Sequence, residues 1–160
     1  MDQRSLFLSF WEKEAEATRK VIARIPQEAS HYRPEPRSRN AREIAWLIVL
    51  EERLLIEGLE SGTIDWQDIP TPESVREILD TYDGQHDEIT ERLRKLDENA
   101  WSIEIPFLAQ GQEIMRATGY HYAWEFLFDQ VHHRGQLSTY LRPMGATVPS
   151  IYGPSADEPF

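Results

Sequence analysis

The stretch AREIAWLIVLEERLLIEGLESG, residues 41–62, carries the strongest signal for the fold. Its apolar residues recur at the spacing of one broad helical face, with charged residues between them. Asn40 precedes the stretch and Glu43 follows three residues later, which is the capping-box pattern that begins a helix. Gly62 supplies a natural end. The stretch therefore predicts a long amphipathic helix that packs against other helices.

Three further segments show helical periodicity, at residues 6–25, 71–96 and 118–143. Pro26 ends the first, Thr71-Pro72-Glu73 begins the second, and Thr118 can cap the third. The region between the last two predicts a small hairpin at best, with one arm through Trp101 and a turn at Gly111. We therefore expect an all-α fold, an antiparallel four-helix bundle with long crossing loops.

The chain length of 160 residues suits one domain, residues 1–160. The proline-rich tail, residues 146–160, is expected to lie along the surface or to reach a neighbour. A net charge of −11 argues against nucleic acid as a partner. No cysteine is present, which excludes disulfides and thiolate chemistry, and no apolar run predicts a signal peptide or a membrane span. We expect a cytoplasmic protein.

Asp129 and His133 form the most informative polar pair of the last helix. They are four residues apart, so both side chains lie on one face and can reach one cation. His132 lies about 100° around the helix from His133, so His133 is predicted to point inward and His132 toward the flank. A hydrogen bond between Asp129 and His133, without any metal, would explain the same spacing.

The surrounding sequence adds a family resemblance. The strings YRPEPRSRNAREIAWLIVLEERLL (32–55) and HHRGQLSTYLRPMGATVPSIYGPSADE (132–158) resemble the DinB family of four-helix bundles. The sharpest element is His133-Arg134-Gly135-Gln136, followed by Tyr140-Leu141-Arg142. The resemblance extends from about Leu6 to Tyr152, and it implies a metal protein with three histidine ligands, one on the second helix and two on the last.

Two of these ligand positions differ in this chain. Leu47 stands where the second-helix histidine is expected and Asp129 stands at the first position of the last helix, so only His133 is unchanged. One hypothesis is a rebuilt metal site of Asp129, His133 and Glu51, because Glu51 lies one turn beyond Leu47 on the same face. The alternative is that the metal has been lost and the pocket is only polar.

The ligand set bears on the metal. Zn²⁺, Ni²⁺, Mn²⁺ and Fe²⁺ are the candidate ions, and two carboxylates with one imidazole shift the preference toward Mn²⁺, Mg²⁺ or Fe²⁺. His86 could donate from a second layer or replace a ligand, but a hydrogen-bonded core histidine beside Tyr82 explains it as well.

The Arg134-Gly135-Gln136 turn has a packing interpretation. Arg134 is expected to stabilise the C-terminal end of the helix, as is Arg142. The resemblance implies that Gly135 lets a neighbouring helix approach and that Gln136 forms a hydrogen bond across the core. Aromatic residues near the helix ends could wall an apolar pocket around Asp129 and His133.

The resemblance implies metal-assisted hydrolysis or transfer of a thiol cofactor to a small electrophile. Whether the protein is an enzyme stays open. The alternative is a non-catalytic small-molecule binding or stress-response module without metal, and the resemblance also implies a homodimer.

Overall fold

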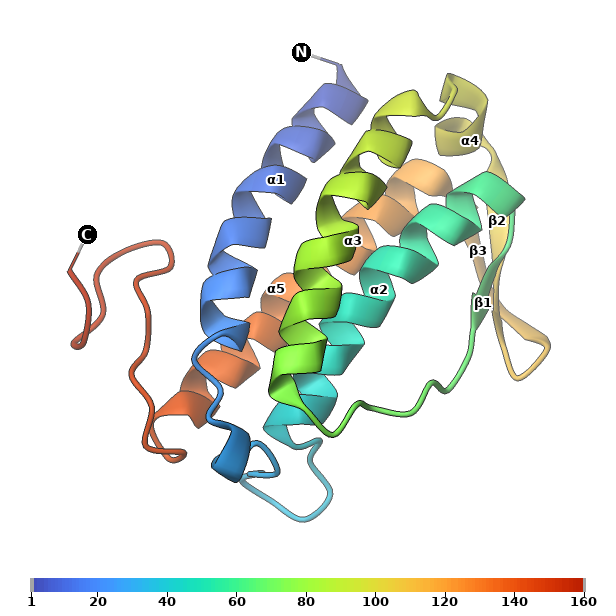
Figure 1. The fold of residues 1–160 in the computed structure, drawn as a ribbon. Coiled ribbons are helices and arrows are strands. Elements are labelled where there is room, and N and C mark those ends of the chain that lie inside the picture. The colour runs from blue at the N-terminus through green and yellow to red at the C-terminus, as the bar shows by residue number, and fades with distance from the viewer. Residues whose placement is uncertain (1, 160) are drawn as a thin grey trace.

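The computed structural model describes residues 2–159; Met1 and Phe160, the ends of the predicted domain and tail, lie outside the described residues. The chain is mostly helical, with four long helices: α1 (Gln3–Ile22), α2 (Ala41–Ser61), α3 (Val75–Lys95) and α5 (Gly119–Leu141). Helix α2 packs against α3 and α5, and α1 packs against the same two helices (Figure 1).

The helix boundaries follow mainly from their caps. The capping box of α2 is confirmed, because Asn40 accepts a hydrogen bond from the Glu43 backbone N–H and donates one to the Glu43 carboxylate. Gly62 ends α2 with φ of 78°, and Thr118 caps α5. The predicted start of α3 at residues 71–73 is wrong. Ser74 is the actual cap, and it accepts a hydrogen bond from the backbone N–H of Glu77.

A small sheet corrects the all-α prediction. Strands β1 (Ile64–Trp66), β2 (Glu104–Ala109) and β3 (Gln112–Thr118) pair in that order, with β1 parallel to β2 and β2 antiparallel to β3. The predicted hairpin is confirmed at Gln110 and Gly111, whose positive φ values suit a two-residue turn. Trp101 is not in an arm of it. It lies buried in α4 (Glu98–Ser102).

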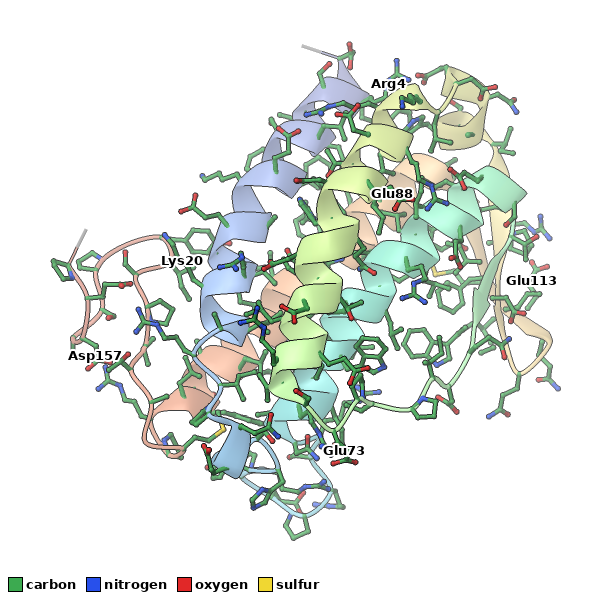
Figure 2. The ribbon with its side chains drawn as sticks, in the orientation of Figure 1. Arg4, Lys20, Glu73, Glu88, Glu113 and Asp157 are labelled. Atoms are coloured by element: carbon green, nitrogen blue, oxygen red, sulfur yellow. The ribbon has the colours of Figure 1, made fainter. Side chains whose placement is uncertain are left out.

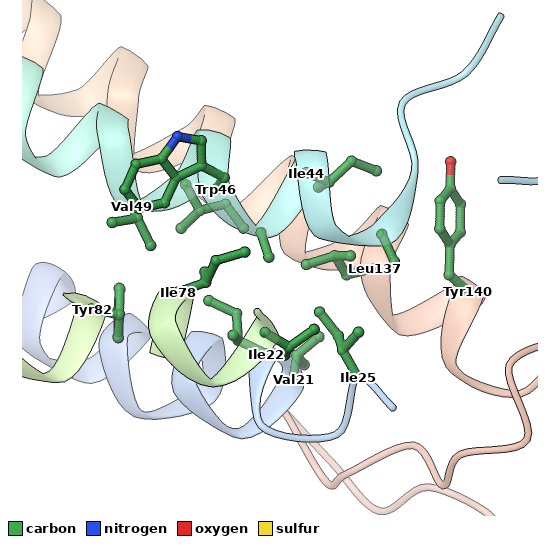
Figure 3. Close-up of a cluster of buried hydrophobic side chains, with 14 of the residues drawn as sticks. Val21, Ile22, Ile25, Ile44, Trp46, Val49, Ile78, Tyr82, Leu137 and Tyr140 are labelled. Atoms are coloured by element: carbon green, nitrogen blue, oxygen red, sulfur yellow. The ribbon is translucent and has the colours of Figure 1, made fainter. Parts of the chain in front are cut away.

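The helices enclose two clusters of buried apolar side chains. One cluster joins α1, α2, α3 and α5 at the end where α2 begins, and Figure 3 shows Ile22, Val49, Ile78 and Leu137 meeting in it. The other, around Trp101, lies toward the sheet. Charged side chains such as Glu88 cover the outer surface (Figure 2). Among residues 2–159, none of the helices combines the length and apolar character that a membrane crossing requires.

The C-terminal tail folds back beside α1 (Figure 1). Ion pairs join Glu158 to Arg24, which follows the end of α1, and Asp157 to Arg142, the C-cap of α5. The Tyr152 hydroxyl donates to the carboxylate of Glu14. The tail therefore contacts the chain's own surface through Tyr152, Asp157 and Glu158, which is one of the two arrangements expected from the sequence.

The predicted roles of the Arg-Gly-Gln turn are corrected. Arg134 lies two turns before the end of α5, buried against α1, with Nη1 2.7 Å from Oε2 of Glu14. Gly135 faces open space, since a Cβ atom there would meet nothing within 4 Å. Gln136 bonds to His133 and His132 of its own helix instead of crossing the core.

Candidate metal centre

Glu51, Asp129 and His133 come together where α2 packs against α5. Each offers one atom suited to bind a metal, and these three atoms lie within 4.8 Å of one another. Helical periodicity explains the meeting, because Glu51 faces α5 from one helix while Asp129 and His133 lie one turn apart on the other. The structure thus brings together all three residues named from the sequence.

His133 is held in a defined orientation. Its Nδ1 lies 2.9 Å from the side-chain oxygen of Gln136 and its Nε2 lies 3.4 Å from Oδ2 of Asp129. Because an amide oxygen only accepts hydrogen bonds, Nδ1 carries a proton. Nε2 therefore faces the carboxylate. When protonated it donates to Asp129, and when unprotonated it offers a lone pair to a cation that both residues can share.

The electrostatics of the three residues differ. Burial, followed by the neighbouring Asp129, raises the pKa of Glu51 well above its usual range. The hydrogen bond from His133 lowers the pKa of Asp129 to about 2. Burial works to lower the pKa of His133, but its bonds to Asp129 and Gln136 outweigh burial and the net direction is upward.

The donor set fits a divalent cation. The Glu51 side chain is 2% exposed, and its Oε2 has no hydrogen-bond partner among residues 2–159. An unsatisfied carboxylate oxygen in such a place costs free energy, and a cation would relieve that cost. Two carboxylates and one imidazole nitrogen are ligands that divalent ions of intermediate and hard character accept.

A cavity of about 550 Å³ gives access to these residues. The side chain of Asp129 is 50% exposed, so the group opens to solvent on one side. The predicted aromatic wall is present in part, since Tyr122, Phe126 and Phe128 line the cavity. The rest of the lining is Arg39, Leu47, Trp66, Phe107, Ile114, Met115, Glu125 and His132.

Six lining residues were not singled out from the sequence: Arg39, Trp66, Phe107, Ile114, Met115 and Glu125. Trp66 and Phe107 come from β1 and β2, and no helical pattern could place them. Arg39 directly precedes Asn40, the N-cap of α2. This position at the start of a helix was the sequence signal available for Arg39. Leu47 lines the cavity but offers no ligand atom, as expected from the sequence.

The remaining histidines are not among the three candidate ligands. His132 lies on the flank of α5, as predicted, where it is exposed and contributes to the lining of the cavity. His86 is confirmed as a hydrogen-bonded core histidine. Its Nδ1 lies 2.7 Å from Oε1 of Glu52, and its ring stacks between those of Trp11 and Tyr82.

Comparison of the sequence with known proteins identifies relatives that match most of the chain. The sequence profile of the DinB family matches residues 1–159. The uncharacterized protein YrdA of Bacillus subtilis (strain 168) is 28% identical over 155 residues, covering 95% of this chain and 89% of YrdA.

Two solved structures share the fold. A DinB-like protein from Bacillus cereus ATCC 10987 superimposes with a TM-score of 0.76 at 24% identity, covering 91% of this chain and 95% of the other. A mycothiol-dependent maleylpyruvate isomerase gives a TM-score of 0.52 at 13% identity, covering 93% of this chain and 63% of the isomerase.

Proposed function

The chain belongs to the DinB family, and from this premise we propose that it holds one divalent cation through Glu51, Asp129 and His133 and acts on a small molecule in the adjoining cavity. One observation carries the proposal. The buried Oε2 of Glu51 lacks a hydrogen-bond partner among the described residues, and it belongs to a group whose three ligand atoms lie within 4.8 Å of one another.

The ligand set guides the choice of ion. One imidazole with two carboxylates is harder than a set of three imidazoles, so Mn²⁺, Mg²⁺ and Fe²⁺ are favoured. Zn²⁺ and Ni²⁺ compete in vitro because they bind nitrogen and oxygen ligands more tightly than Mn²⁺ does. Reconstitution experiments should therefore include all five.

The proposed reaction is metal-assisted hydrolysis or transfer of a thiol to a small electrophile. A bound cation polarises a substrate oxygen or activates water or a thiol. The chain contributes the surroundings: Gln136 orients the His133 ring through Nδ1, and the aromatic walls limit the access of water. A neighbour of the same fold is mycothiol-dependent, which makes thiol-dependent chemistry the first class to assay.

Metal content and binding test this proposal. Purified protein, reconstituted with each ion and analysed by elemental analysis and calorimetry, is expected to bind one ion per chain. Glu51→Gln, Asp129→Asn and His133→Ala should each lose binding. Glu57→Gln on α2 and His121→Ala on α5 are matched controls, since both residues are exposed outside the candidate ligand group, and they should bind as the wild type does. Wild-type protein that binds no divalent ion overturns the proposal.

A second candidate uses the same cavity without a metal. Leu47 at a position facing the cavity and the largely apolar lining favour a non-catalytic small-molecule binding module, for instance in a stress response. Thiol transfer or hydrolysis that depends on Asp129 and His133 in folded protein would exclude it.

The assembly and location of the protein belong to the proposal as well. We propose a cytoplasmic homodimer in which exposed apolar side chains of α1, such as Leu6 and Phe10, become covered. Light scattering at high protein concentration tests the assembly, and a monomeric mass contradicts it.

A further inference from the structure

Arg39 differs from most arginines of this chain, because among the described residues its guanidinium group has no polar partner. Eleven of the fourteen arginines form ion pairs with carboxylates. Arg4 donates to the backbone oxygen of Leu96. Within residues 2–159, the guanidinium groups of Arg39 and Arg53 have neither an ion pair nor a hydrogen bond. Of these two, Arg39 lines the cavity that contains the candidate ligands.

The acidic residues Glu43 and Glu125 form no ion pair with Arg39 among the described residues. The Glu43 carboxylate accepts a hydrogen bond from the backbone N–H of Asn40 and lies 3.6 Å from Arg33. Glu125, the remaining acid of the lining, is exposed to solvent and lies 3.7 Å from His121. The guanidinium is nevertheless close enough to the candidate ligands that its charge works to lower the pKa of both Glu51 and His133. It is therefore a cationic group available to a ligand of the cavity.

The charges of the candidate ligands restrict how much negative charge an anion bound to Arg39 can carry. A divalent cation would balance the carboxylates of Glu51 and Asp129, and the carboxylate of Glu125 is largely exposed to solvent, which screens its charge. The guanidinium of Arg39 then supplies a single positive charge to the cavity. One carboxylate on the ligand neutralises that charge. A phosphate monoester carries nearly two negative charges, and its excess would be repelled by a protein whose net charge is −11. A guanidinium also binds a carboxylate through two parallel hydrogen bonds.

The remaining lining suits an apolar body. Trp66, Phe107 and Phe126 contribute aromatic surface to the cavity. Ile114 and Phe128 also line the cavity and are 62% and 61% exposed, so they add apolar surface that a ligand can contact. We propose that Arg39 binds the carboxylate of an amphipathic small molecule whose apolar body lies against this aromatic surface. The inference rests on the proposed function in taking this cavity as the substrate site.

Matched probes test the inference by calorimetry. The probes are 4-phenylbutyrate, its neutral amide and the phosphonate of the same length, each titrated with and without Mn²⁺. Wild-type protein is expected to bind the carboxylate about tenfold more tightly than the amide, since hydrogen bonds to charged groups contribute at least that much. Arg39→Met should remove this preference while leaving the affinity for the amide unchanged, and Arg39→Lys should retain part of it. Arg53→Met is the control for loss of an unpaired arginine and should retain the full preference.

Several outcomes overturn the inference: no binding of the carboxylate at millimolar concentration, equal affinity for carboxylate and amide, tighter binding of the phosphonate, or an unchanged preference in Arg39→Met. Its failure is distinguishable from failure of the metal proposal. A protein that binds Mn²⁺ but shows no carboxylate preference contradicts only the role of Arg39. An Arg39-dependent preference in protein that binds no divalent ion supports the role of Arg39 and contradicts only the metal.

Discussion

Nδ1 of His133 lies 2.9 Å from the side-chain oxygen of Gln136, three residues further along α5. The amide nitrogen of Gln136 lies 3.0 Å from Nε2 of His132, so the Gln136 side chain is held at both ends. This arrangement fixes which nitrogen of His133 faces Glu51 and Asp129. Such outer partners of a ligating histidine set its tautomer and raise its basicity.

Replacing Gln136 by Leu is therefore expected to weaken divalent-metal binding by about 10- to 100-fold without removing a ligand. Calorimetric titration with Mn²⁺ measures the change. His132→Ala is the control, because it removes the other partner of Gln136 and leaves the bond to His133 in place. Equal affinities of Gln136→Leu and wild type would show that Gln136 does not position the ligand.

Glu51→Gln is expected to raise the melting temperature of the metal-free protein and to remove the further rise that a bound metal gives. The folded-state pKa of Glu51 lies above its unfolded value, so the folded state binds more protons and stability declines as the pH rises between the two values. Gln removes this loss, and the melting temperature of metal-free protein should rise at mildly alkaline pH. The further rise that Mn²⁺ gives to wild-type protein should disappear. A lower melting temperature of the metal-free variant would contradict this account.

Metal affinity is expected to increase with pH. The pKa values of Glu51 and His133 are both raised, so protons compete with the cation at two of the three ligands. Asp129, with its pKa lowered to about 2, is already ionised and adds no pH dependence in the neutral range. Calorimetry in buffers of different ionisation enthalpy should detect proton release on binding. Affinity that does not change from mildly acidic to mildly alkaline pH would argue against these ligands.

The helices and the three candidate ligands were predictable because their information is local. The capping box at Asn40 and Glu43 is read within four residues, and the spacing of Asp129 and His133 fixes one helical face. Glu51 required a further step, because the family resemblance placed a ligand position at Leu47 and Glu51 lies one turn beyond it on the same helical face. The structure confirms that the three residues are adjacent, and their metal binding stays a prediction.

The features that the sequence did not reveal depend on distant contacts. Strand β1 is three residues long, and Ile64 pairs with Phe107, a partner far along the chain. Without that partner, the segment resembles a polar connection. Arg134 has a charged side chain near the end of a helix, and only the position of α1 shows that it is buried against Glu14. A local pattern cannot give either result.

Breaking the buried pair of Arg134 and Glu14 is expected to destabilise the fold strongly. Their side chains are 2% and 10% exposed, and removing one partner of such a pair costs about 3–5 kcal/mol because the other charge stays buried. Arg134→Met should show this loss in chemical denaturation, and adding Glu14→Leu should recover much of it. Arg142→Met breaks the ion pair between half-exposed Arg142 and Asp157, and it should lower the free energy of unfolding by less than about 1 kcal/mol. Equal losses in the two single variants would contradict the assignment.

Two glycines in helices should respond oppositely to alanine. At Gly58 in α2, a Cβ atom would lie 2.3 Å from Cγ1 of the buried Ile64, so Gly58→Ala must displace β1 from the helix and is expected to cost about 1–3 kcal/mol. At Gly135 a Cβ atom would meet nothing within 4 Å, so Gly135→Ala should stabilise the protein by up to about 1 kcal/mol through helix propensity alone. Denaturant titration of both variants measures the difference. Destabilisation by Gly135→Ala would mean that another chain approaches α5 at this position, as a dimer formed through this face of the helix would require.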